Sequence, residues 1–259
     1  MGLLSYYLLT ILPHEEVGKS ITYIFSAFTR DTYNLIIAVL VASTLILLSY
    51  YLFPKVKIHK ERPTILIFTG ITLIFILLCF NILFVNNIEA IHFLQYAIFS
   101  IICFKLTKNY TRTILIGALA GFFDELYQYM VLAPDTSDYF DFNDVVINII
   151  GTGIGLIICK ILTFKTVTYS KKECLFMPEL WILIAMVIFY FYGSHSGIIS
   201  VLQNPDNPSS FSFLKHLPES FWTTLPRQNI KYHILFPMPG LLISCILCLF
   251  YATLGINKT

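Results

Sequence analysis

Charged residues are scarce in this chain of 259 residues, at 12% of the total, where a soluble domain carries about 25%. Apolar residues make up 57%, and the mean hydropathy is +0.75. They come in continuous blocks, and a membrane crossing needs about 20 such residues. The scarcity of charge excludes an ordinary soluble domain, and a net charge of +2 is too small to suggest nucleic acid. The composition therefore predicts the lipid bilayer as a partner.

Two further absences narrow the class of protein. The apolar run Gly2–Leu12 has no basic residues before it and no small-residue cleavage pattern after it, so we expect no signal peptide. None of the six cysteines falls in a loop predicted below to be extracytoplasmic, which excludes a disulfide framework.

Seven apolar blocks predict an all-α fold, a polytopic transmembrane helix bundle. The third and sixth blocks are at the short limit for a crossing, and the prolines that open the seventh suit the first turn of a helix. The blocks are Tyr33–Phe53, Thr64–Val85, Glu89–Phe104, Thr113–Leu132, Asp144–Phe164, Leu180–Tyr192 and Ile234–Leu254.

Three regions are expected along the chain. Residues 1–30 are predicted to be an interfacial amphipathic segment, because apolar residues recur at helical spacing in its second half. Residues 31–165 form the transmembrane core, and residues 166–259 add two spans with a long outer loop at 193–233. The prolines of this loop argue against a packed domain and its aromatic residues against disorder, so we expect short helices lying on the membrane. The spaced apolar residues are Val17, Ile21, Ile24, Phe25 and Phe28.

Positive charge is distributed unevenly between the two predicted sides of the membrane. Most of the 17 Lys and Arg residues lie in the loops after the first, third and fifth blocks. Cytoplasmic loops carry such an excess, which predicts a multi-pass protein of the cell membrane with its N-terminus outside and its C-terminus inside.

Polar and ionisable residues gather in the third, fourth and fifth blocks. Such residues are costly within a membrane and mark functional sites. They lie at the start of the third block, the end of the fourth and the start of the fifth, which share the outer face in the predicted orientation. The candidate binding residues are Glu89, His92, Tyr96, Asp124, Glu125, Gln128, Asp141, Asp144 and Asn148.

Glycines accompany these polar stripes. Gly117 and Gly121 lie on the stripe of the fourth block, and Gly151 and Gly155 on that of the fifth. Small residues at four-residue spacing let helices approach closely, so these are candidate helix-packing positions and the stripes should face each other. The sequence therefore predicts an acidic, histidine-bearing pocket that opens outward.

Several roles suit these residues. His92, Glu125 and Asp144 are candidate catalytic residues, and together with Glu89 they are candidate ligands of a divalent metal, because Glu89-x-x-His92 has the spacing of metal sites in helical bundles. Acid–base chemistry would need no metal. Hydrogen bonding between helices is the simplest alternative, but it does not call for several carboxylates at one depth, where they repel one another.

The spacing resembles the VanZ-like family of bacterial membrane proteins. The resemblance covers residues 87–156 and consists of a His followed by Tyr, then Glu-x-x-Gln, then Asp-x-x-x-Asn-x-x-Gly-x-x-x-Gly. It implies a multi-helix membrane domain associated with the cell envelope, and the family's named member is linked to low-level resistance to the glycopeptide teicoplanin. It implies no particular reaction. The matching residues here are His92, Tyr96, Glu125, Gln128, Asp144, Asn148, Gly151 and Gly155.

Two departures from the family pattern both replace a cation with an acid. Ile88-Glu89 stands where the family often has Asp-Lys, and Asp138 where it commonly has Arg. The site would thus favour a cation, a divalent metal or shared protons over an anion.

Three functions remain open from the sequence. The first is a protein that binds or modifies a cationic or lipid-linked ligand, such as an envelope precursor or a lipid headgroup. The second is an intramembrane metal-dependent or acid–base enzyme, and the third is a proton- or cation-coupled transporter.

Overall fold

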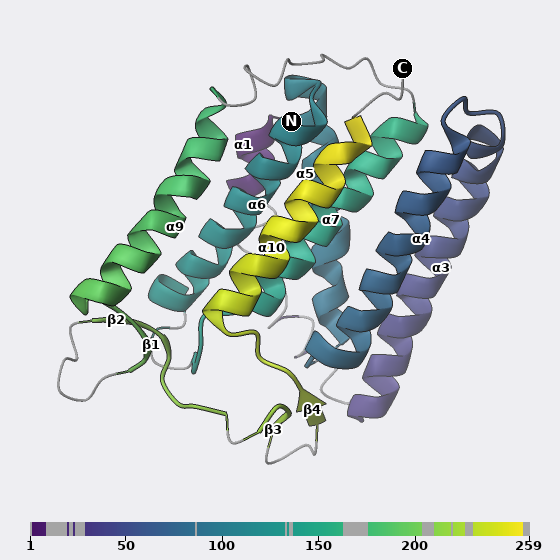
Figure 1. Ribbon diagram of the computed structural model, residues 1–259. Helices are drawn as coiled ribbons and strands as arrows, with labels where there is room; N and C mark the ends of the chain where they lie inside the picture. Colours follow the sequence, from purple (N-terminus) through teal and green to yellow (C-terminus); the bar gives the residue numbers. More distant parts are fainter. Residues whose placement is uncertain are drawn as a thin grey trace.

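The structure is a computed structural model, and it describes residues 2–8, 20, 23, 29–85, 87–132, 134, 137–162, 176–203, 210–218, 220–225 and 230–255. Seven helical segments are long and apolar enough to cross a membrane, in agreement with the seven predicted blocks (Figure 1). They are Asp31–Lys57, Arg62–Leu83, Asn87–Thr107, Tyr110–Leu132, Phe142–Ile161, Pro178–Ser196 and Pro237–Gly255.

Several helix ends follow from local sequence. The side chains of Thr29 and Asn109 accept hydrogen bonds from backbone amides in the first turns of α3 and α6, and Pro237 opens α10. Short π-helical turns extend α4 and α6, and a 3-10 turn precedes α5. The elements are α1 Leu3–Tyr6, α3 Arg30–Lys57, α4 Arg62–Leu78, η3 Cys79–Leu83, η4 Asn87–Ala90, α5 Ile91–Thr107, α6 Tyr110–Tyr127, η5 Gln128–Leu132, α7 Phe142–Ile161, α9 Pro178–Ser196, α10 Pro237–Ala252 and η6 Thr253–Gly255.

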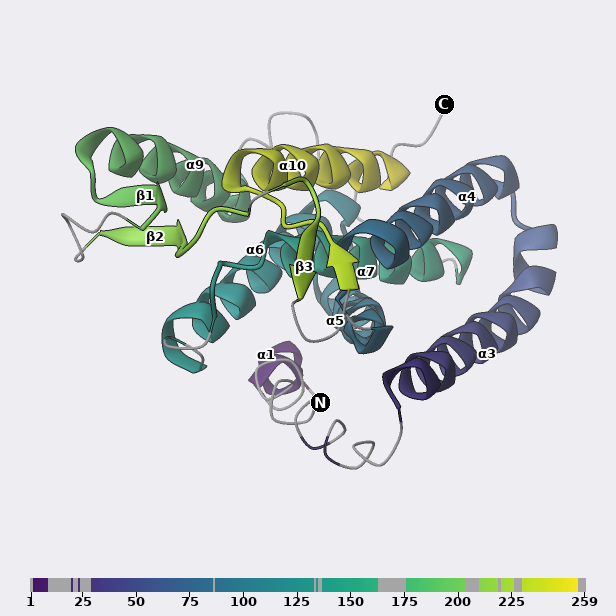
Figure 2. The ribbon, with the colours of Figure 1, turned by 90° about the horizontal axis from the view of Figure 1, so that it is seen from below.

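Helix α7 occupies the middle of the bundle, and nearly all of its residues are buried. Figure 2 shows α4, α5, α6 and α10 around it, while α3 and α9 lie at the periphery. Glycines allow the close contacts. A Cβ added at Gly151 would lie 3.0 Å from the backbone oxygens of His92 and Phe93, and one added at Gly121 would lie 2.9 Å from Cβ of Asn148. The three helices that carry the polar stripes therefore pack against one another.

The third and sixth spans are longer than expected. They contain 21 and 19 residues, because α5 continues through polar residues as far as Thr107 and α9 continues to Ser196. Gly197 then ends α9 in the left-handed conformation, with φ of 74°, which glycine adopts without steric cost. Hydropathy alone does not detect these polar final turns.

Beyond the end of α9, the prediction of short helices in the loop 193–233 is wrong for the described residues, whose regular structure consists of two small sheets. Strands β1 (Ile199–Leu202) and β2 (Phe211–Leu214) pair in parallel, and β3 (Thr223–Leu225) and β4 (Ile230–Tyr232) pair antiparallel. Each strand is only three or four residues long and depends on a partner elsewhere in the loop, so a local pattern did not reveal it.

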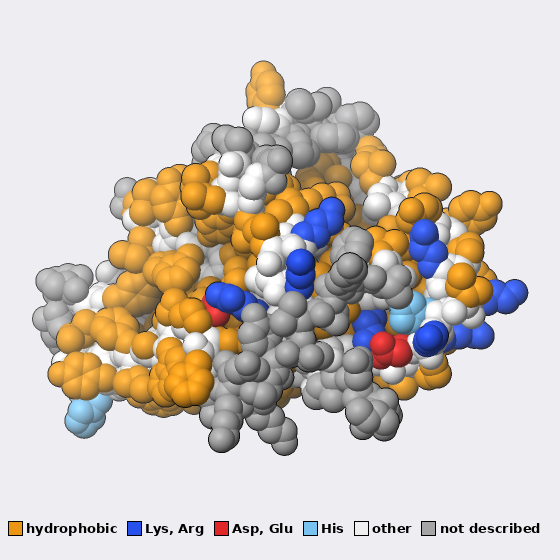
Figure 3. Space-filling model, turned by 90° about the horizontal axis from the view of Figure 1, so that it is seen from above, with side chains coloured by type: hydrophobic (Ala, Val, Ile, Leu, Met, Phe, Trp, Pro, Cys, Tyr) orange, Lys and Arg blue, Asp and Glu red, His pale blue; other side chains and the backbone are white. Residues whose placement is uncertain are grey.

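The two sheets lie at the end of the bundle where α6 ends and α5 and α7 begin, at the bottom of Figure 1. The amide of Phe140 donates to the carbonyl of Phe213 at 2.8 Å, and the amide of His233 donates to that of Ile82 at 2.7 Å. Lys and Arg side chains are visible on the opposite face (Figure 3).

The amphipathic helix expected at residues 17–28 lies outside the described residues, apart from Ser20 and Tyr23. The N-terminal segment is described chiefly at residues 2–8, where α1 packs against α5 and Tyr7, just after α1, contacts α6. Tyr6 donates a hydrogen bond to the carbonyl of Gln95 and Tyr7 donates one to that of Ala120, each at 3.0 Å.

Candidate functional site

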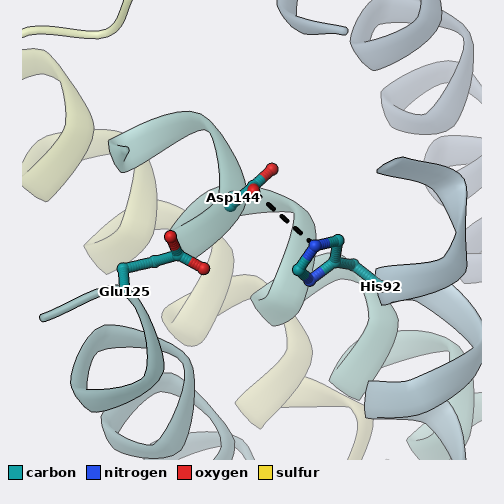
Figure 4. A group of neighbouring side chains, drawn as sticks. All are labelled: His92, Glu125 and Asp144. Atoms are coloured by element: carbon teal, nitrogen blue, oxygen red, sulfur yellow. Dashed lines mark ion pairs between the residues drawn. The ribbon is translucent and has the colours of Figure 1, made fainter. Parts of the chain in front are cut away.

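Three side chains from three different helices converge near the end of the bundle that carries the sheets. His92 comes from α5, Glu125 from α6 and Asp144 from the first turn of α7 (Figure 4). One nitrogen or carboxylate oxygen of each lies within 4.8 Å of the others. His92 and Glu125 are 4% and 3% exposed, and the Asp144 side chain is 15% exposed. The cluster is thus nearly enclosed, with Asp144 as its most accessible member.

The His92 ring is held by the amide side chain of Asn148. Its Nδ1 lies 2.9 Å from Oδ1 of Asn148, and because a carbonyl oxygen only accepts, Nδ1 is the donor. In the neutral ring, Nε2 then carries the lone pair, and it lies 3.6 Å from Oδ2 of Asp144. A lone pair and a carboxylate attract each other only when a proton or a metal cation lies between them.

Glu125 and the first turn of α7 also have polar neighbours. Gln128 donates to Oε1 of Glu125 at 3.1 Å. The side chain of Asp141 caps α7 by accepting from the amides of Asn143 and Asp144 at 2.9 and 3.3 Å. Burial raises the pKa of Asp141 well above its ordinary value, and the charge of Asp144 raises it further, against the lowering effect of the two amides. Two acidic side chains therefore lie at the start of α7, and burial together with the charge of Asp144 favours the protonated form of Asp141.

A further acid lies beside the cluster. Asp124 is fully buried, and the hydroxyl of Tyr96 donates to its Oδ2 at 3.3 Å. Burial raises the pKa of the phenol of Tyr7, in the N-terminal segment, and the nearby charges of Asp124 and Glu125 raise it further. Sequence reasoning missed Tyr7, since the only signal was a pair of tyrosines in an apolar run.

Two predicted residues lie apart from the cluster. Glu89 is in the 3-10 turn η4, and both of its carboxylate oxygens accept from the amide of Val85 at 3.2 Å. The carboxylate is thereby turned toward the backbone that precedes its own helix, and Glu89, expected as a fourth metal ligand, is not part of the cluster of His92, Glu125 and Asp144. Asp138 is exposed, and its backbone carbonyl accepts from the amide of Lys215 at 2.8 Å.

Asn143 is a positioning residue that sequence reasoning also missed. Its Nδ2 donates to the carbonyls of Leu83 and His233 at 3.2 and 2.8 Å, and its Oδ1 accepts from the amide of Leu235 at 3.0 Å. One buried amide therefore joins the start of α7 to the end of α4 and to the segment before α10. Its position two residues after an N-cap aspartate was the only signal in the sequence.

Comparison with known proteins gives one family. Residues 3–163 match the sequence profile of VanZ/LLP1, a stretch that includes α1 and every residue of the cluster. No curated protein and no solved structure matches the chain.

Proposed function

The chain belongs to the VanZ/LLP1 family of membrane proteins, and from its buried cluster we propose that it binds a divalent cation through His92, Glu125 and Asp144. The observation that carries this proposal is the meeting of one imidazole nitrogen and two carboxylates within 4.8 Å of one another. One imidazole with two carboxylates suits Zn²⁺ or Mn²⁺.

The details of the cluster support a metal over a simple hydrogen bond. Two ligands of a tetrahedral zinc ion, each about 2.1 Å from it, lie about 3.4 Å apart. The 3.6 Å between Nε2 of His92 and Oδ2 of Asp144 is close to that spacing and too long for a good hydrogen bond. Asn148 binds the other ring nitrogen of His92, as the outer partners of metal-bound histidines do.

Three protein ligands leave one coordination position for a substrate or water. We propose that this position takes an oxygen of a lipid-linked molecule of the cell envelope, since the cluster lies near one end of the spans and the ligand need not leave the membrane. The family's link to glycopeptide resistance agrees with a ligand of this class.

The test is metal analysis of the purified full-length protein after equilibration with Zn²⁺ or Mn²⁺. We expect about one equivalent in the wild type. His92→Ala, Glu125→Gln and Asp144→Asn should each reduce it to background. Asp138→Asn removes an acid at the same end but outside the cluster, so it serves as the matched control and should keep the metal.

Absence of metal from the wild type, or its retention in all three variants, would overturn the proposal. Acid–base chemistry by the same residues would then be the better hypothesis. Transport would instead require flux into liposomes that follows a pH or cation gradient.

A further inference from the structure

An apolar groove of about 220 Å³ runs between α3, α4 and α7, away from the acidic cluster. Its lining includes Leu52 of α3, Thr69 of α4 and Ile158 of α7. Figure 2 shows α3 and α4 meeting at the turn that joins them and diverging from it. The groove therefore opens toward the surface where lipid chains would lie.

A second pocket, of about 450 Å³, lies at the turn between α3 and α4. It is lined by Lys55, His59, Lys60 and Glu61, and Ile161 lines both this pocket and the groove, so the two adjoin. Glu61 is paired with Lys160, whose Nζ lies 2.7 Å from Oε1. Within the described part of the chain, Lys55 and Lys60 have no acidic partner, and the pocket keeps a positive charge.

His59 adds a hydrogen-bond donor to this pocket. Its Nδ1 lies 3.0 Å from the backbone nitrogen of Glu61 and must accept, because a backbone amide can only donate. The proton of the neutral ring is then on Nε2. That nitrogen is buried and has no hydrogen-bond partner among the described residues. A buried donor without a partner is costly, so an acceptor in the pocket would be stabilising.

We propose that one anionic phospholipid, of the phosphatidylglycerol type, binds here with its phosphate in the lysine pocket and an acyl chain in the groove. The phosphodiester oxygens would accept from His59 and lie against Lys55 and Lys60, while the groove offers an apolar surface next to them. Basic pockets between transmembrane helices bind anionic headgroups in this way. This site is separate from the cluster of His92, Glu125 and Asp144 and does not depend on the proposed function.

The test uses the full-length protein in nanodiscs that contain equal amounts of phosphatidylglycerol and phosphatidylcholine. Lipids that remain bound after transfer to detergent are counted by native mass spectrometry. The wild type should retain one phosphatidylglycerol in preference to phosphatidylcholine. Each lysine contributes about fivefold to the binding of an anionic lipid, so Lys55→Gln with Lys60→Gln should lower this preference by about 25-fold.

Matched controls separate the site from general surface charge and from general lipid contact. Lys57 lies in the same last turn of α3 but does not line the pocket, so Lys57→Gln should keep the preference. Thr69→Phe would fill the groove and reduce retention of the lipid. Gly70→Phe should leave retention unchanged, because a Cβ at Gly70 has nothing within 4 Å.

Equal retention of the two lipids by the wild type would overturn the proposal. So would an equal loss in Lys57→Gln and in the double variant, since that result indicates diffuse attraction to the surface. Thr69→Phe and Gly70→Phe with the same effect would exclude the groove as the place of the acyl chain.

Discussion

His92 illustrates how a single hydrogen bond decides what a side chain can bind. Because Nδ1 donates to Asn148, the ring presents Nε2 to Asp144 in a fixed orientation. Asn148 is itself fully buried in the middle helix, and Thr152 donates to its backbone carbonyl at 2.9 Å. The amide therefore acts as a support for the proposed metal ligand.

Removing that support should weaken the metal site without removing a ligand. We expect Asn148→Ala to reduce the affinity for the bound metal by about 10- to 100-fold, as the loss of outer partners does in other sites. Competition with a chelator measures this change. Thr152→Val removes a neighbouring hydroxyl that contacts no ligand, and it should leave the affinity unchanged. Equal affinity in the wild type and Asn148→Ala would contradict the role of Asn148.

At the scale of the helices, the glycines determine how close the polar stripes come. Gly155 of α7 faces α5, and a Cβ added there would lie 2.7 Å from Cβ of Ser100 and would also overlap the carbonyl of Ala97. A backbone carbonyl cannot move aside as a long side chain can. Larger residues at this position would therefore push α5 and α7 apart.

Gly155→Ala should consequently destabilise the bundle by about 1–3 kcal/mol, the usual cost of overpacking. Gly70→Ala is the matched control, because nothing lies within 4 Å of its added methyl group. Unfolding in mixed micelles by increasing the fraction of denaturing detergent measures the difference. A Gly155→Ala protein that is as stable as the control would show that the helices can separate at little cost.

The helices could be predicted from the sequence because burying charge in a membrane is costly. This cost keeps each apolar block poor in charged residues, whatever the rest of the chain does. Because successive spans run in opposite directions, the sequence also predicted that the polar ends of three spans lie at one end of the bundle. Contacts that join distant segments were not predictable. Asn143 bonds to the end of α4 and to the segment before α10, and these bonds depend on where those two backbones lie. The strands of the loop 193–233 were missed for the same reason.

At the scale of the whole molecule, the distribution of charge predicts which end faces the cytoplasm. Asp138 lies at the end with the sheets, and Lys57 lies in the last turn of α3. Lys and Arg are in excess in the loops at the end of the bundle where Lys57 lies. This excess predicts that the end with Lys57 is cytoplasmic.

Labelling of intact cells tests this orientation. With a maleimide that does not cross membranes, Asp138→Cys should be labelled from outside, whereas Lys57→Cys should be labelled only after the cells are opened. The unsubstituted chain gives the background from its own cysteines. The reverse pattern would place the acidic cluster at the cytoplasmic end.

The contacts of α10 have a consequence for how the bundle is completed during synthesis. The ring of Tyr251 fills the space beside Gly153, and its hydroxyl lies 3.0 Å from that of Thr72. Gly240 lies against Phe142 at the other end of the same interface. The central helix is therefore enclosed only after the last span has inserted, although the family match ends at residue 163. A fragment that ended at residue 163 would leave the side of α7 that α10 covers open to lipid, in the same helix that carries Asp144.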